Sequence, residues 1–267
     1  MNRDVLITGI PRSGTTLLTA LLDCPPASVA IGEPSALGAW QKRFANDHGG
    51  FTRALIELFR KVREEILSKS PVRDRVSIDG EPLTNYVRRT ADGGTCKSYV
   101  SADRIIDHVE RDFVLLMKSP VIYTAVLPTI VSDGHFKVLV IIRDPLATLL
   151  SWNSVNFPIS KGRLPAGELY WPKLREVGDL NCTLFERQAR IWELFASRYL
   201  EYQDSIILLR YEDLVAHQFA VVDSLKLPRR AVDIKDMNRS PAYNVAKVSA
   251  IREALAKYSP TSTYYYP

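Results

Sequence analysis

The residues near the N-terminus that are best suited to chemistry form a glycine-rich loop, GIPRSGTT, at positions 9–16. Such a loop turns backbone N–H groups and the start of the following helix toward an anion. A nucleoside-triphosphate loop reads GxxxxGK[ST], and Thr15 stands where its lysine would be, so Arg12 is the nearby cation instead. The pattern predicts a phosphate site and disfavours an ATPase or kinase. A tight glycine turn without a ligand is the alternative.

Two further side chains are expected at the same place in the fold. Glu33 follows a short apolar run, and Lys118 ends another, VLLMK. Because the carboxyl ends of parallel strands meet at one edge of a sheet, both charges should face the crevice beside the loop. The ordinary alternatives are a solvated loop carboxylate for Glu33 and, for Lys118, a packed stem with its head in water.

The sequence PRSGTTLL at positions 11–18 resembles the 5′-phosphosulfate loop of sulfotransferases that use 3′-phosphoadenosine 5′-phosphosulfate (PAPS), especially the branch of tyrosylprotein and bacterial enzymes. The resemblance implies PAPS as donor, adenosine 3′,5′-bisphosphate as product and no metal requirement, because protein cations hold the leaving group. It covers roughly residues 4–33 and 113–215.

The resemblance extends to a second anion site. The family marks its 3′-phosphate site by an arginine at a strand end and a serine eight positions on, and Arg143 and Ser151 match it, although Arg143 could simply pair with Asp144. The segment LRYEDL at 209–214 resembles the family segment whose tyrosine, here Tyr211, helps to hold the same end of the donor. The donor residues implied are Pro11, Arg12, Ser13, Gly14, Thr15, Thr16, Arg143, Ser151 and Tyr211.

The resemblance also implies catalytic roles. Glu33 would accept the proton of the acceptor hydroxyl, while Lys118 and Arg12 would stabilise charge on the leaving phosphate. The histidine base of the phenol and steroid branch has no counterpart, which favours the branch with a glutamate base. The C-terminal RKGxxGDW loop of cytosolic members is absent as well. Three residues could replace its cation: Arg239, Asn244 or Lys247.

The elements that must position these residues alternate between strand and helix. This alternation predicts an α/β fold with a three-layer parallel sheet flanked by helices, that is, a P-loop sulfotransferase-like fold. The strands are expected at Val5–Thr8, Val29–Ile31, Phe113–Met117, Phe136–Ile142 and Ser205–Leu209. The helices are expected at Thr15–Asp23, Phe51–Leu67, Val121–Val131, Pro145–Ser154, Thr183–Tyr202 and Asp213–Leu225.

Residues 1–267 are expected to form a single domain. A helical insert at about 38–109 and a loop at about 157–181 lie outside the resemblance and are expected to form the acceptor-binding cap. Aromatic residues that could line that pocket are Trp40, Trp152, Phe157, Tyr170 and Trp171. The terminal TSTYYYP follows no pattern that we can interpret.

The composition is that of an ordinary globular protein. The chain has 35 Lys plus Arg against 30 Asp plus Glu, a net charge of +5, 46% hydrophobic residues and three widely spaced cysteines. The charge suits a small polyanion but is too mild to indicate nucleic acid, and the cysteines support neither disulfides nor zinc. No stretch approaches the ~20 apolar residues of a membrane span, so we expect a cytoplasmic protein without an integral membrane segment.

The sequence therefore predicts a sulfotransferase that moves the sulfuryl group of PAPS to a hydroxyl of a small metabolite, a carbohydrate or a natural product. A magnesium-dependent P-loop kinase and a non-catalytic nucleotide-binding protein are the alternatives. The acceptor and the oligomeric state stay open at this stage.

Overall fold

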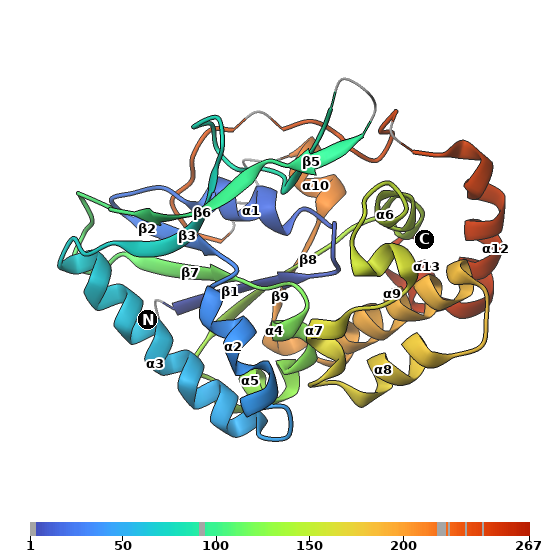
Figure 1. Cartoon of the computed structure of the whole chain (residues 1–267), viewed down its shortest axis with the longest axis horizontal. Coiled ribbons are helices and arrows are strands. Elements are labelled where there is room, and N and C mark those ends of the chain that lie inside the picture. Colours follow the sequence, from blue (N-terminus) through green and yellow to red (C-terminus); the bar gives the residue numbers. More distant parts are fainter. Residues whose placement is uncertain (1–3, 91–93, 218–222, 224, 233, 242) are drawn as a thin grey trace.

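A five-stranded parallel sheet organises the protein (Figure 1). The computed structural model describes residues 4–90, 94–217, 223, 225–232, 234–241 and 243–267. The strands lie in the order β2-β7-β1-β8-β9, and their bounds are Asp4–Gly9 (β1), Ser28–Gly32 (β2), Val114–Lys118 (β7), Lys137–Ile142 (β8) and Ile207–Arg210 (β9). All five strands expected from the sequence are present, with ends that differ by one or two residues.

Helices cover both faces of this sheet. They are α1 (Thr15–Leu22), α2 (Ser35–Arg43), α3 (His48–Leu67), α4 (Ile122–Ala125), α5 (Leu127–Asp133), α6 (Pro145–Trp152), α7 (Pro165–Glu168), α8 (Pro172–Asp179), α9 (Leu184–Glu201), α10 (Tyr211–Ala216), α12 (Val248–Tyr258) and α13 (Thr261–Tyr265). Short 3₁₀ turns form at Pro158–Lys161, Gln203–Ser205 and Val245–Lys247.

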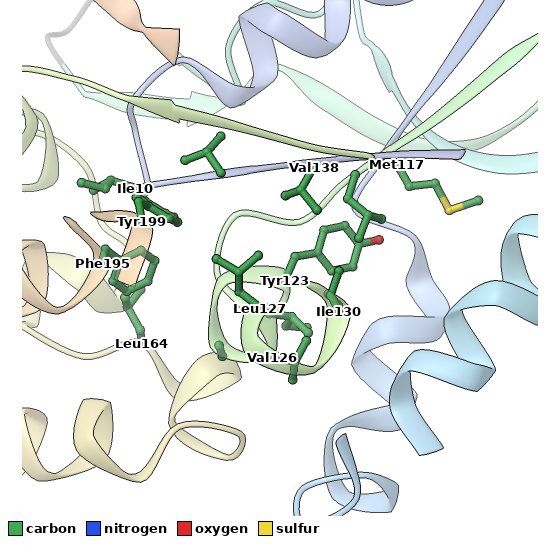
Figure 2. Close-up of a cluster of buried hydrophobic side chains, with 14 of the residues drawn as sticks. Ile10, Met117, Tyr123, Val126, Leu127, Ile130, Val138, Leu164, Phe195 and Tyr199 are labelled. Atoms are coloured by element: carbon green, nitrogen blue, oxygen red, sulfur yellow. The ribbon is translucent and has the colours of Figure 1, made fainter. Parts of the chain in front are cut away.

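The central strands are apolar at nearly every position because side chains on both faces are buried. On one face Val5 and Ile7 pack against α1 and α10. On the other, Leu6 and Val138 belong to a larger cluster with α3–α6, α9 and α12. Figure 2 shows part of that cluster, where side chains of α4 and α5 lie beneath the strands. The three-layer α/β fold expected from the sequence is confirmed.

The register aligns the carboxyl ends of the strands that carry the site. Lys118 of β7 pairs with Gly32 on one side and with Ile7 on the other, and Gly9 of β1 pairs with Ile141 of β8. The residue after each of these strands therefore emerges at one edge of the sheet.

Local capping fixes where helices begin. Asp144 accepts a hydrogen bond from the Ala147 amide (2.7 Å), and Pro145 occupies the first position of α6, as the Asp-Pro sequence predicts. Thr183 and Glu186 form a reciprocal capping box at the start of α9.

The expectation of a helical insert over about 38–109 is wrong beyond Leu67. After α2 and α3 the chain forms two antiparallel pairs of strands, β3 (Val72–Ser77) with β6 (Tyr99–Arg104) and β4 (Val87–Arg89) with β5 (Thr95–Lys97). In VRDRVS three consecutive charged residues separate two valines, and burial alternates only at the start, where Val72 and Asp74 are buried and Arg73 is exposed. This pair joins the main sheet through Asp74, whose Oδ1 accepts from the Gly32 amide at 2.9 Å.

Three other segments differ from expectation in detail. The loop at about 157–181 contains a 3₁₀ turn and the helices α7 and α8. The terminal TSTYYYP contains α13, in which the Tyr265 hydroxyl donates to the Ala196 carbonyl of α9. The helix expected over Asp213–Leu225 ends at Ala216 as α10, and positions 218–222 and 224 lie outside the described residues.

Within the residues that the structure describes, no helix combines the length and the apolar character needed to cross a bilayer.

Candidate functional site

Glycine is required at two points of the loop between β1 and α1. Gly9 has φ 155°, and a Cβ there would lie 2.2 Å from the Ile141 carbonyl oxygen. Gly14 has φ 98° in the left-handed region, and its Cβ would lie 2.8 Å from the Tyr211 ring. The loop is further held by the Trp152 indole, which donates to the Pro11 carbonyl at 2.7 Å. Backbone and neighbouring strands therefore dictate the glycine spacing.

The loop leaves one buried hydroxyl without a partner. Ser13 is fully buried, and its Oγ has no hydrogen-bond partner among the described residues. An unpaired buried hydroxyl is costly, so this turn above α1 carries a local loss of stability.

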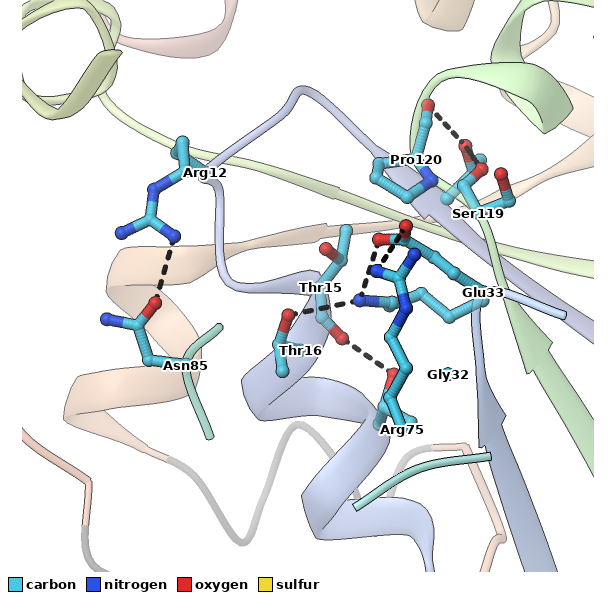
Figure 3. Close-up of polar contacts among 12 residues, drawn as sticks. Arg12, Thr15, Thr16, Gly32, Glu33, Arg75, Asn85, Ser119 and Pro120 are labelled. Carbon is cyan, nitrogen blue, oxygen red and sulfur yellow. Dashed lines mark hydrogen bonds and ion pairs between the residues drawn. The ribbon is translucent and has the colours of Figure 1, made fainter. Parts of the chain in front are cut away.

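Arg12 is a partly exposed cation held by two neutral side chains. Its Nε donates to Ser151 Oγ (3.3 Å) and its Nη1 to Asn85 Oδ1 (2.9 Å), the latter drawn in Figure 3. Burial lowers the pKa of Arg12 to about 10, and the nearby Arg143 acts in the same direction. Arg12 stays charged at neutral pH with no described carboxylate within ion-pair distance.

Arg143 is buried at the end of β8. Its guanidinium donates to Asn238 Oδ1 (2.7 Å), the Tyr243 hydroxyl (2.9 Å) and the Arg12 carbonyl (3.1 Å). No ion pair joins Arg143 to Asp144, whose carboxylate caps α6 instead. Two adjacent guanidiniums without a carboxylate among the described residues form a cationic site suited to phosphate oxygens.

Tyr211 reaches this site through its ring rather than its hydroxyl. The Arg143 guanidinium lies 4.6 Å from the ring centroid. The hydroxyl donates to the Lys235 carbonyl and accepts from the Met237 amide, each at 3.0 Å. Tyr211 therefore anchors the chain that carries Asn238 beside Arg143.

The carboxylate of Glu33 lies between two cations (Figure 3). Its Oε1 is 3.2 Å from Lys118 Nζ, and its Oε2 accepts from Arg75 Nη1 at 2.6 Å. Glu33 has φ 49°, and its backbone amide donates to the Lys118 carbonyl at 2.9 Å. The turn after β2 thus directs the carboxylate toward the end of β7.

Lys118 is the most deeply buried charge of the site, with 1% of its side chain exposed. Its Nζ donates to Thr16 Oγ1 (3.1 Å) at the start of α1 and lies 3.7 Å from the centroid of the Tyr86 ring. Burial lowers the pKa of Lys118 to about 8, an effect that Glu33 opposes. The ammonium is thus held against the loop.

One cleft of about 1130 Å³ brings these groups together. The walls include most of the residues expected from the sequence: Pro11, Arg12, Gly14, Thr15, Thr16, Glu33, Lys118, Arg143, Ser151 and Tyr211. Ser13 is fully buried and does not line the cleft. The cleft therefore contains a carboxylate beside an ammonium together with two guanidiniums.

A family model described as a sulfotransferase domain matches residues 2–226. The chain belongs to this sulfotransferase family. Its fold can also be compared with solved structures, although a comparison with curated proteins finds no match. The sulfotransferase domain from the curacin biosynthetic pathway is 16% identical with a TM-score of 0.44, over 90% of this chain and 77% of the other. Sulfotransferase STF1 from Mycobacterium tuberculosis is 14% identical with a TM-score of 0.43, over 96% and 77%.

The C-terminal part of this sulfotransferase contributes residues that sequence analysis missed. Asn238 and Tyr243 hold Arg143, whereas none of the three residues suggested from the sequence, Arg239, Asn244 and Lys247, lines the cleft. Asn244 instead caps a 3₁₀ turn by accepting from the Ala246 amide at 3.0 Å. No motif spacing connects this segment to β8, so only the fold reveals the contact.

The segment between α3 and β7 contributes the other missed residues of the sulfotransferase, namely Arg75 in β3 and Asn85 and Tyr86 just before β4. The expected helical character of this segment concealed them, because a helix would not present residues 75, 85 and 86 at one place.

Most aromatic residues suggested for the acceptor pocket serve the core. Trp152, Tyr170 and Trp171 are buried in the main hydrophobic cluster, and Trp40 packs against it. Phe157 alone of the five lines the cleft.

Among the described residues, no group of three or more histidine, cysteine, aspartate or glutamate side chains is arranged to hold a metal ion.

Proposed function

We propose that this sulfotransferase moves the sulfuryl group of PAPS to a hydroxyl of an acceptor, which is a small metabolite, a carbohydrate or a natural product. The observation that carries the proposal is the 3.2 Å contact between Glu33 Oε1 and Lys118 Nζ, at the mouth of the loop and in one cleft with Arg12 and Arg143. Mere nucleotide binding does not require a carboxylate held at that point.

The donor set fits a molecule with two separate phosphates. Arg143 and Ser151 would hold the 3′-phosphate, and the backbone of the loop, Arg12 and the start of α1 would hold the 5′-phosphosulfate. The two guanidiniums without described carboxylate partners support this fit. When bound, PAPS supplies an activated sulfuryl group whose leaving group is a phosphate.

The residues of this chain would then accept a proton and stabilise negative charge. Glu33 accepts the proton of the acceptor hydroxyl as its oxygen bonds to sulfur. The bond between sulfur and the bridging oxygen breaks, and Lys118 and Arg12 stabilise the charge left on the phosphate. The cleft receives walls from the insert, such as Tyr99, and from the loop after α6, such as Phe157, so we propose both as the acceptor-binding cap of a single domain.

The first test is calorimetric titration of the protein with adenosine 3′,5′-bisphosphate in EDTA, beside ATP with magnesium. We expect micromolar binding of the bisphosphate that is weakened in Arg143→Ala and unchanged in Arg239→Ala, which removes an exposed cation outside the cleft. Binding of magnesium-ATP alone would contradict the proposal and favour a kinase.

A second test concerns transfer. With ³⁵S-labelled PAPS and a panel of hydroxyl compounds, Glu33→Gln should lower turnover by ~10² to 10⁴ while the bisphosphate still binds. Full turnover of this variant would exclude Glu33 as the base. If the unaltered protein binds the bisphosphate but labels no acceptor across phenols, sugars and aliphatic alcohols, a non-catalytic binding protein is the better description.

A further inference from the structure

Each residue assigned to catalysis has a partner in the segment between α3 and β7. Asn85 accepts from Arg12 (2.9 Å), the Tyr86 ring lies 3.7 Å from Lys118 Nζ, and Arg75 donates to Glu33 (2.6 Å). This segment therefore contacts the catalytic residues as well as lining the cleft, and the shortest of the three contacts is that of Arg75 with Glu33.

Arg75 is itself held rigidly. Its guanidinium carbon lies 4.9 Å from the centroid of the Tyr86 ring and 5.0 Å from that of Tyr99, and the two rings, whose centroids are 4.6 Å apart, lie together on one side of it. Three quarters of its side chain is buried. Its guanidinium is thereby restricted to a narrow range of positions.

The backbone on either side of the Arg75–Glu33 contact is tied together as well. Asp74 Oδ1 accepts from both the Gly32 amide (2.9 Å) and the Arg75 amide (2.7 Å). Asp74 Oδ2 in turn lies 3.3 Å from Arg104, which also pairs with Asp23. The start of β3 and the turn that carries Glu33 thus move as one unit.

We propose that Arg75 is a positioning residue for sulfuryl transfer, which holds Glu33 Oε2 so that Oε1 stays beside Lys118 and open to the acceptor hydroxyl. This inference rests on the proposed role of Glu33 as the base. Without Arg75, a single lysine contact would hold the carboxylate, and the side chain could turn about its last bond. Arg75 acts through Glu33 and does not touch the reacting atoms.

Arg75 also sets the charge around the base. The charged and titratable groups that face Glu33 are Lys118 from β7, Arg75 and Asp74 from β3, Tyr86 from the segment before β4, and Tyr123 from α4. Removing Arg75 removes one of the two cations that contact the Glu33 carboxylate and leaves Lys118 as its only ion-pair partner among the described residues.

The test compares Arg75→Ala, Arg75→Lys and the matched control Arg73→Ala in sulfuryl transfer from labelled PAPS. Arg73 lies on the same strand, but its side chain is 53% exposed and pairs with Asp103. Arg75→Ala should lower kcat about 100-fold. Its KM for PAPS should stay within about twofold.

Two further measurements distinguish a positioning role from a purely structural one. Arg75→Lys should retain more of kcat than Arg75→Ala but less than the unaltered protein, because lysine supplies the charge without the planar fork. Free guanidinium ion should restore part of the activity of Arg75→Ala, and Arg73→Ala should match the unaltered protein. Wild-type kcat in Arg75→Ala overturns the inference, as does a loss of kcat that comes with weakened bisphosphate binding and is not restored by guanidinium ion.

The result separates this inference from the proposed function. If Glu33→Gln keeps full turnover, the role of Glu33 fails and that of Arg75 fails with it. If Glu33→Gln is inactive while Arg75→Ala is unimpaired, only the inference about Arg75 fails. If both roles hold, the double variant Glu33→Gln/Arg75→Ala should be no slower than Glu33→Gln alone, because Arg75 acts only through the carboxylate.

Discussion

At the scale of single residues, the site depends on an ammonium kept out of water. The Tyr86 ring covers Lys118, and only 1% of the lysine side chain is exposed to solvent. This burial lowers the pKa of Lys118 to about 8. Glu33 opposes that shift and keeps the lysine charged near neutral pH. A lysine in such surroundings changes its charge within the range of ordinary assays.

Sulfuryl transfer should therefore decline as pH rises through about 8, because the lowered pKa of Lys118 means that its positive charge is lost there. Lys118→Arg should remove this alkaline limb, since a guanidinium stays charged, even if its different shape lowers kcat. The profile of kcat against pH measures the effect, with the exposed Lys42→Arg as control. An alkaline limb that persists unchanged in Lys118→Arg would contradict this assignment.

Gly32 is a second residue on which the site depends. A Cβ on Gly32 would lie 2.7 Å from the Tyr86 hydroxyl, so Gly32→Ala should push the ring away from Lys118. We expect a loss of about 1–3 kcal/mol in the free energy of unfolding, as for overpacked cores. Urea denaturation checks this.

The matched control for Gly32→Ala is Gly38→Ala in α2. A Cβ at Gly38 meets no atom within 4 Å, so the substitution should stabilise by about 0.4–1 kcal/mol. Equal free energies of unfolding in the two variants would show that the Tyr86 ring can move aside without loss of stability.

At the scale of elements, α9 positions the segment after α6. Gln188 of α9 donates to the Ile159 carbonyl (3.0 Å) and accepts from Asn153 (2.8 Å). The helix begins at a capping box in which Thr183 Oγ1 accepts from the Glu186 amide (3.3 Å) and Glu186 accepts from the Thr183 amide (2.9 Å). The cap therefore supports one wall of the cleft at a distance.

Thr183→Ala should lower the free energy of unfolding by about 1 kcal/mol, because it removes the acceptor of the Glu186 amide at the start of α9. Thr183→Ser keeps the hydroxyl and should remain close to the unaltered protein. Both are compared by urea denaturation. An equal loss in the serine variant would indicate that the methyl group, rather than the hydrogen bond, matters.

At the scale of the whole molecule, the C-terminal segment completes the cationic end of the cleft. Asn238 donates to Glu212 (2.9 Å) and accepts from Arg143 (2.7 Å), while Tyr266 donates to the other oxygen of Glu212 (2.9 Å). Figure 1 shows this part of the chain running past α10 to α12 and α13 beside α9. Ligand binding at Arg143 should therefore also stabilise the C-terminal segment.

A bisphosphate ligand at 100 times its Kd should stabilise the protein by about 2.7 kcal/mol and raise its Tm. Tyr243→Phe removes the hydroxyl that accepts from Arg143 at 2.9 Å. The loss of one such bond, about 1 kcal/mol, should weaken bisphosphate binding roughly fivefold and reduce the rise in Tm. Tyr264→Phe, at a side chain 59% exposed, is the control. An undiminished rise in Tyr243→Phe would place Tyr243 outside the donor site.

The sequence by itself determined the five strands, the loop at 9–16 and the start of α6. Each depends on a local pattern: a short apolar run, glycines where φ or close packing demands them, and an Asp-Pro cap. The parallel register then follows from the strand-helix alternation, which explains why Glu33, Lys118 and the loop could be placed at one sheet edge in advance.

Only the tertiary structure decided which partners these residues have. Arg75, Asn85 and Tyr243 lie far along the chain from Glu33, Arg12 and Arg143, and no spacing relates them. Charged strands such as β3 are hard to predict from sequence, because distant parts of the chain, rather than a local apolar pattern, bury their side chains. A contact between distant segments is a property of the packed chain, because it forms only when the sheet and both insertions are in place.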